Sequence, residues 1–179
     1  MGSRFRVNDD KVWICLLIPV FRENPMPKID IEAIAQSNAT GYPAPFDAEV
    51  QGRYWRRLAP AIGLTQMGAS HVVLKPGAWS SQRHWHDGED ELVVMLLGEA
   101  VLIEDDGETV MRAGDVAAWQ AGIANGHQLQ NRTDSDCVFI AVGTADRSKG
   151  GGYSDIDMTF DQNGYYHKDG TPYPVTRLI

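Results

Sequence analysis

Residues 77–98 of the chain read G-A-W-S-S-Q-R-H-W-H-D-G-E-D-E-L-V-V-M-L-L-G, and this stretch decides how the rest is interpreted. His84 and His86 are separated by one residue, and Glu91 follows after four more. Two residues at positions i and i+2 of a β-strand point to the same face, so both imidazoles can reach one point. The turn after His86 returns the chain and brings the Glu91 carboxylate beside the histidine pair. Imidazole and carboxylate are ligands of divalent transition metals, so the stretch predicts a metal site.

A second stretch, residues 114–131, supplies His127 as the predicted fourth ligand. Three imidazoles and one carboxylate suit Zn, Fe, Mn, Ni or Co, and this mixed set does not choose among them. We therefore expect one divalent metal per chain, with coordination positions open to water or substrate, as Lewis-acid catalysis requires. The alternative interpretation is that the histidines lie on an exposed strand and that the acidic residues around them form a solvated loop.

Short runs rich in Val, Ile, Leu and Thr continue outward from these stretches, and each is closed by Gly, Asp or Pro. Asp105-Asp106-Gly107 is a hairpin signal between two of the runs. Regularly spaced short strands without a long helical period predict an all-β sandwich or barrel. The expected strands are 65–67, 70–74, 91–97, 100–104, 109–112, 115–119, 127–131 and 136–142.

The first stretch resembles the first motif of the cupin superfamily. That motif is a glycine, a His-x-His pair, three or four residues, a glutamate, six residues and a second glycine. One extra residue separates the first glycine from the first histidine in this chain. The matching residues are Gly77, His84, His86, Glu91 and Gly98.

The second stretch resembles the second cupin motif, in which a Pro-x-Gly turn precedes a histidine and an asparagine. Gln120 replaces the proline, and four residues rather than two separate Gly122 from His127. Gly114, Gly122, His127 and Asn131 match. The resemblance covers roughly residues 64–143. It implies a small antiparallel jelly-roll barrel that holds its metal inside.

The chain also looks like one group of single-domain bacterial cupins, whose members are loosely described as sugar-phosphate isomerases or as regulators. This resemblance also implies a homodimer, because an uncovered edge strand invites association. The stretches that carry it are 41–46, 79–86, 125–131, 153–157 and 167–173.

Outside the predicted barrel, the apolar run Val12–Phe21 leaves two interpretations open. It is an edge strand or arm that packs on the domain or on a second copy, or the residues before Met26 are not native. The run is too short to span a bilayer, and it lacks the flanks of a secretory signal. The predicted division is an N-terminal extension (1–25), an N-terminal arm (26–63), the cupin barrel (64–143) and a C-terminal arm packing on the barrel (144–179).

Three shorter segments carry their own local signals. Residues 37–46 contain two prolines and a glycine, which predicts a surface loop. The glycine run at residues 148–152 predicts a flexible loop. Residues 167–173 predict an ordered turn.

Size and charge limit the partners that we expect. The chain has 179 residues, which suits one domain with arms, and a formal net charge of −8. A protein this acidic would repel a phosphate backbone, so we expect no nucleic-acid partner. Cys15 and Cys137 form no zinc or redox pattern, and a reducing cytoplasm is the default compartment. We expect a small-molecule ligand and no membrane.

The leading functional hypothesis is a metal-dependent isomerase of sugar phosphates. Such an enzyme moves a proton between adjacent carbons, and a divalent metal that holds the two oxygens lowers the cost of the enediolate. It also needs a base, a phosphate clamp and partners for hydroxyl groups. The candidates are Glu89 and Asp90 as bases, Arg83 and Lys75 as clamps, and Gln82 and Gln128 as hydroxyl partners.

Three other hypotheses compete with the isomerase. An iron-dependent dioxygenase would use the same four ligands. A non-catalytic binding module would capture a small polar metabolite at a metal-anchored pocket. A storage-like structural cupin would need no metal, and the intact ligand set argues against it. Trp79, Trp85 and Trp119 are interpreted as core or rim aromatics rather than as a substrate platform.

Overall fold

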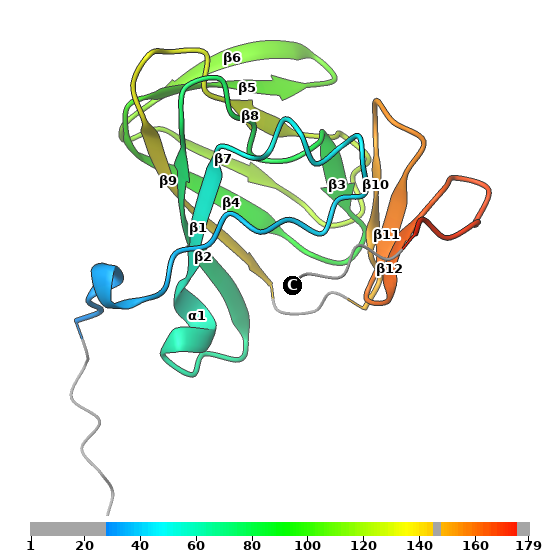
Figure 1. Ribbon diagram of the computed structural model, residues 1–179, viewed down its shortest axis with the longest axis horizontal. Helices are drawn as coiled ribbons and strands as arrows, with labels where there is room; N and C mark the ends of the chain where they lie inside the picture. Colours follow the sequence, from blue (N-terminus) through cyan, green and yellow to red (C-terminus); the bar gives the residue numbers. More distant parts are fainter. Residues whose placement is uncertain (1–27, 145–147, 175–179) are drawn as a thin grey trace, which may run out of the picture.

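The computed structural model describes residues 28–144 and 148–174, which fold into antiparallel β-sheets (Figure 1). Two short helical segments accompany the sheets, η1 (Ile31–Ala33) and α1 (Leu58–Ala61). The prediction of a mostly-β chain is confirmed. The predicted extension at residues 1–25, with its apolar run and Cys15, lies outside the described residues.

A five-stranded sheet forms the larger layer of the fold, in the order β1-β2-β9-β4-β7. Its central β2–β9 pair runs in register over eight residues, from Met67 opposite Thr144 to Leu74 opposite Cys137. Strands from the two ends of the predicted barrel segment therefore lie side by side. The bounds are β1 (Arg53–Arg57), β2 (Met67–Leu74), β9 (Cys137–Thr144), β4 (Glu91–Leu97) and β7 (Val116–Trp119).

Two smaller sheets form the facing layer, and two isolated bridges join them. One sheet has the order β6-β5-β8 and the other β12-β11-β10-β3. The bridges pair Trp79 with Gln130 and His84 with His127, so the β8 segment runs beside the β3 segment. The bounds are β3 (His84–His86), β5 (Glu99–Glu104), β6 (Gly107–Arg112), β8 (Gln128–Gln130), β10 (Gly151–Tyr153), β11 (Thr159–Asp161) and β12 (Gly164–Tyr166).

The main core fills the space between the five-stranded sheet and the β6-β5-β8 sheet. Alternate residues of each strand point inward, as the two-residue period of a strand requires. The buried side chains are Val72 and Leu74 of β2, Val93 and Met95 of β4, Phe139 of β9, Leu102 of β5, Met111 of β6 and Leu129 beside them. None of the predicted metal ligands belongs to this cluster.

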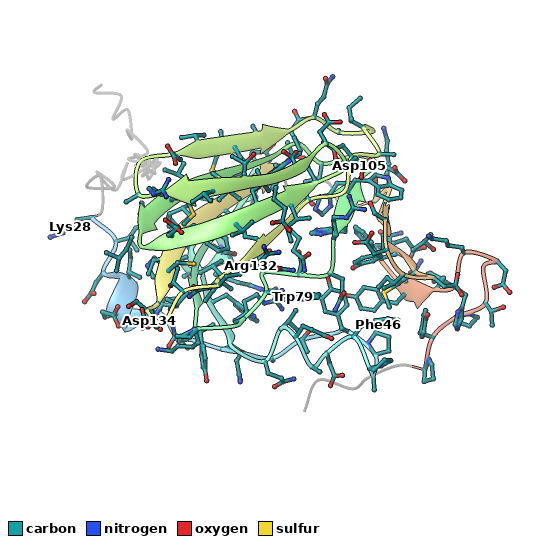
Figure 2. The ribbon with its side chains drawn as sticks, turned by 90° about the horizontal axis from the view of Figure 1, so that it is seen from above. Lys28, Phe46, Trp79, Asp105, Arg132 and Asp134 are labelled. Atoms are coloured by element: carbon teal, nitrogen blue, oxygen red, sulfur yellow. The ribbon has the colours of Figure 1, made fainter. Side chains whose placement is uncertain are left out.

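A second buried cluster ties the N-terminal segment to the C-terminal strands. It contains Tyr42, Val50, Tyr153 and Met158, and Phe46 packs against it. Figure 2 shows Phe46 on the N-terminal segment beside the C-terminal strands, where its ring meets Tyr173 at 6.2 Å between centroids. The prediction of a surface loop at residues 37–46 was therefore wrong for Tyr42, which is only 5% exposed.

Most of the predicted strands are present, with two differences. The hairpin signal at Asp105-Asp106-Gly107 is confirmed, because β5 and β6 pair up to Glu104 opposite Gly107. The run expected at 70–74 is longer than predicted: β2 begins at Met67, because Gly68 and Ala69 pair with β9 without interruption, whereas residues 65 and 66 of the run expected at 65–67 lie outside the strand.

The glycine run at residues 148–152 is the second difference. Gly151 and Gly152 are buried in β10, which pairs with β3, so this part is a strand and not a flexible loop. A Cβ atom on Gly151 would lie 2.0 Å from the Trp85 carbonyl oxygen. Glycine is therefore required here by the close approach of two strands. The turn predicted at 167–173 is confirmed by two backbone hydrogen bonds: the His167 amide donates to the Thr171 carbonyl, and the Gly170 amide donates to the His167 carbonyl.

Candidate metal centre

Backbone pairing places His84 and His127 side by side. The His84 amide donates to the His127 carbonyl at 3.2 Å, and the His127 amide donates to the His84 carbonyl at 2.9 Å. Two residues that exchange both hydrogen bonds in an antiparallel pair project their side chains to the same face. Their ring centroids are 5.1 Å apart. The longer turn after Gly122 therefore does not displace His127, because the pairing with His84 fixes it.

His86 and Glu91 complete the group from β3 and from the first position of β4. His86 lies two residues after His84 and shares its face. Glu91 Oε2 is 3.2 Å from His86 Nε2 and 3.0 Å from His127 Nε2. One ligand atom from each of the four residues lies within 4.8 Å of every other.

Each imidazole is oriented by a contact on its far side. His84 Nδ1 is 3.0 Å from the Gln82 carbonyl oxygen, which leaves Nε2 free to face the group. His86 Nδ1 is 3.5 Å from Glu89 Oε2. His127 stacks on Trp119 with centroids 3.8 Å apart and planes 12° apart. Contacts of this kind fix the ring orientation that metal coordination needs.

The electrostatics of the group favour the forms that bind metals. Burial, followed by the neighbouring His127 and His86, lowers the pKa of His84 to about 3. Burial by itself would raise the pKa of Glu91, but hydrogen bonds from His127 and His86 outweigh it and hold that pKa well below its usual range. At neutral pH the His84 ring is therefore neutral and Glu91 is ionised, as metal ligands must be.

The four side chains fit a divalent transition metal. Imidazole nitrogens and carboxylate oxygens bind such ions at about 2.0–2.2 Å, so adjacent ligand atoms lie roughly 3 Å apart. The distances from Glu91 to His86 and His127 have this size. The set would suit Zn, Fe, Mn or Ni, and its chemistry does not select one.

The side chains of His84, His86, Glu91 and His127 line a cavity of about 780 Å³. The five-stranded sheet contributes Val93, Phe139 and Ala141 to the lining, and the C-terminal strands contribute Tyr153 and Phe160. A volume of this size suits a small metabolite. The site therefore combines a metal cage, meaning the four candidate ligands His84, His86, Glu91 and His127, with room for a small molecule.

Of the six other candidate residues, two line the cavity and four lie away from it. Glu89 and Gln128 line the cavity, and both are buried. The Gln128 amide donates to the Ser81 carbonyl at 2.8 Å and accepts from Gln130, so it mainly shapes the wall. The Gln82 amide points instead to the Phe46 carbonyl and the Glu49 carboxylate, and it anchors the N-terminal segment.

The remaining three candidates make structural contacts away from the cavity lining. Arg83 is paired with Asp155 and with Asp105, which lies in the turn between β5 and β6 (Figure 2). Asp90 accepts a hydrogen bond from the Ala121 amide at 2.8 Å. Lys75 pairs with Asp136 beyond the Cys137 end of β9, whereas Glu91 lies opposite Gly143 near the other end. Neither predicted clamp faces the cavity.

Sequence reasoning missed the residues that make the cavity polar away from the metal cage. Arg53 of β1 lines the cavity, and so do Tyr42, Tyr153 and Tyr165. A usable signal was present, because Arg53, Trp55 and Arg57 alternate on one strand and therefore share a face. No local sequence pattern indicated that Tyr42, which lies in a proline-rich segment, would be buried.

The comparisons with known proteins agree with this fold. Residues 70–143 match the family model described as a cupin domain. A crystal structure named as a sugar phosphate isomerase from a cupin superfamily, from Silicibacter pomeroyi, is 43% identical with a TM-score of 0.78. The match covers 83% of this chain and 97% of that chain. The chain belongs to the cupin superfamily.

Two further relatives show how widely this fold is used. The oxalate-binding protein of Thermotoga maritima is 36% identical over 73 residues, which are 41% of this chain and 58% of that protein. The polyketide cyclase RemF of Streptomyces resistomycificus is 15% identical with a TM-score of 0.55. That match covers 68% of this chain and 80% of that chain, and it shows the fold alone. A common fold does not fix a common function.

No helix in the described part of the chain is both long and apolar enough to cross a membrane.

Proposed function

We propose that this cupin is a metal-dependent enzyme that isomerises a small polar metabolite, with a sugar phosphate as the leading substrate class. The observation that carries the proposal is the convergence of His84, His86, Glu91 and His127 on one wall of a cavity with room for a metabolite. The 43% identity to a protein named as a sugar phosphate isomerase supports the substrate class. The metal-anchored site supports the chemistry.

The mechanism divides the work between the four ligands and Glu89. His84, His86, Glu91 and His127 would hold a divalent metal, which would supply Lewis acidity toward the oxygens of a bound substrate. Glu89 is the better of the two candidate bases, because it lines the cavity and Asp90 does not. Its carboxylate would take a proton from the hydroxyl-bearing carbon and deliver it to the adjacent carbonyl carbon. The hydroxyl proton would pass to the former carbonyl oxygen, so the reaction has no net proton change. Glu89 is buried, with only 7% of its surface exposed.

The Glu89→Gln variant is expected to lower turnover by roughly 10²- to 10⁴-fold, because the amide cannot accept the proton. Metal content should change little, since the substitution is isosteric and keeps an oxygen beside His86. Steady-state kinetics and elemental analysis measure the two effects. Asp90→Asn is the matched control and should keep near wild-type turnover. Equal losses in both variants would exclude Glu89 as the specific base.

A non-catalytic module that binds a small metabolite is the second candidate function. Similarity to an oxalate-binding protein favours it. A panel of sugar phosphates and oxygen-dependent substrates, tested with Fe, Mn, Ni and Zn, separates the candidates. Interconversion of isomers supports the proposal, and oxygen consumption would indicate a dioxygenase instead. Ligand-induced thermal stabilisation without turnover would establish the binding module.

We also propose that the chain works as a homodimer. The edge strand β7 exposes Val116, and the neighbouring β4 exposes Leu92 and Leu96 beside it. An apolar sheet edge of this kind favours association with a second copy. Light scattering should give twice the monomer mass, and Val116→Lys should shift the protein toward the monomer. Ile123→Lys, at another exposed apolar position, is the control. A monomeric wild-type protein would contradict the proposal.

A further inference from the structure

The guanidinium of Arg53 is a cation on the cavity wall without a matching anion. Arg53 stands on β1 opposite Leu74, whose side chain is in the core, so its own side chain points inward. One terminal nitrogen, Nη1, donates to the Ser80 carbonyl at 2.6 Å. Its Nε is buried and has no hydrogen-bond partner among the described residues. Within the same part of the chain, no carboxylate forms an ion pair with Arg53.

This arrangement is costly unless a ligand completes it. Arg53 as a whole is partly buried, and a charge that loses part of its hydration without a counter-charge is not fully compensated. Arg83, Arg112 and Arg132 each pair with a carboxylate, whereas Arg57, which also lines the cavity, lies over the Trp55 ring. A cation that is left unpaired in a cavity is therefore a candidate anion receptor.

Three tyrosines line the same cavity near this cation and carry neutral hydroxyl groups. The Tyr153 hydroxyl donates to the Tyr42 hydroxyl at 3.2 Å, and Tyr165 stacks on Tyr42 with centroids 5.4 Å apart. Burial raises the pKa of Tyr42 to about 12, so its hydroxyl stays protonated near neutral pH. Protonated hydroxyls can donate to an anion, whereas carboxylates would repel it.

Tyr153 connects this region to the metal cage. Its ring stacks on His84 with centroids 5.7 Å apart, because the two residues are paired in adjacent strands β10 and β3. The cavity thus has a metal-binding pole at His84, His86, Glu91 and His127 and a cationic pole at Arg53. Tyr153 lies between the two poles, because its hydroxyl donates to Tyr42 and its ring stacks on His84.

We propose that the ligand of this cavity is a hydroxylated metabolite with an anionic group, phosphate or carboxylate, which Arg53 binds while the oxygens at the other end face the metal cage. This inference rests on the proposed function, because it assigns the substrate class of that same site. It makes Arg53 a specificity-determining residue and takes the role of phosphate clamp from Arg83 and Lys75. The planar fork of arginine can bind either oxyanion in a bidentate manner.

The test compares charged and uncharged probes on metal-loaded protein. Calorimetric titration would use ribose 5-phosphate, gluconate and ribose, with wild type, Arg53→Gln and Arg53→Lys. We expect an anionic probe to bind wild type at least tenfold more tightly than ribose. Arg53→Gln should weaken that probe by roughly 10- to 100-fold and leave ribose unchanged. Arg53→Lys keeps the charge without the fork and should restore part of the affinity. Preference for ribose 5-phosphate over gluconate, or the reverse, identifies the anionic group.

Arg112→Gln, which breaks a surface ion pair with Glu99, is the matched control and should bind all probes like wild type. Metal content and circular dichroism should be unchanged in every Arg53 variant, since none of the four ligands is altered. Equal affinity of wild type for charged and uncharged probes, or failure of both anions to bind, would overturn the inference. If anion binding does not depend on Arg53 but the protein still turns over its substrate, the inference fails and the proposed function stands. Absence of metal and turnover, with anion binding that still depends on Arg53, would instead remove the proposed function alone.

Discussion

His84→Ala and His86→Ala should each abolish metal retention and leave a folded protein. Each substitution removes one of three imidazoles from the group around Glu91, and the remaining three ligands bind a divalent ion far more weakly. The fold should persist, because the main core contains none of the ligands. Elemental analysis after gentle purification should give about one divalent metal per wild-type chain and only traces in the variants.

His167→Ala is the control for these variants. His167 pairs with Asp157 at 2.8 Å and lies outside the metal group, so its removal should leave the metal content unchanged. A variant at His84 that keeps its metal would show that the four residues are not the site. An unfolded variant by circular dichroism would show that the metal is structural.

Gly151→Ala should produce the largest loss of stability among the substitutions considered. The new Cβ would lie 2.0 Å from the Trp85 carbonyl oxygen and 2.8 Å from the Phe160 ring, so β10 has to move away from β3. We expect a decrease in the free energy of unfolding of about 3 kcal/mol or more, the upper range for overpacking. Urea denaturation followed by circular dichroism measures it. Metal affinity should also fall, because Gly151 pairs directly with His86.

Gly107→Ala is the matched control, because a Cβ atom there meets nothing within 4 Å. Its φ of +126° makes alanine unfavourable, so a smaller loss of about 1–2 kcal/mol is expected. A loss at Gly151 no larger than that at Gly107 would mean that the close approach of β10 and β3 is relieved at little cost.

The metal group shows how much local sequence can determine. The His84-x-His86 spacing requires a shared face on a strand, and the following turn returns Glu91 to it, so three of the four ligands are predictable over eight residues. The fourth was predicted from a resemblance in which the loop length differed. Its position depends on a backbone pairing with His84 across 43 residues, and the loop length does not disturb that pairing.

The wrong predictions share a cause. Gly151 and Gly152 were interpreted as a flexible loop, because a glycine run has no side chains to indicate a buried strand. Their place beside Trp85 depends on a segment more than 60 residues earlier in the chain. Tyr42 was assigned to the surface because its burial also depends on residues distant in sequence, Tyr153 and Tyr165.

The donor atoms, the strand period and the hairpin could be predicted from local sequence, since each depends on residues within a few positions of one another. The pairing of the arginines could not, because it depends on residues that the fold brings together. Arg83 stands next to the metal ligands in sequence but is neutralised by Asp155, 72 positions away, whereas Arg53 faces the cavity and pairs with no described carboxylate. Charge pairing is a property of three-dimensional neighbours, and the order of residues along a chain does not specify it.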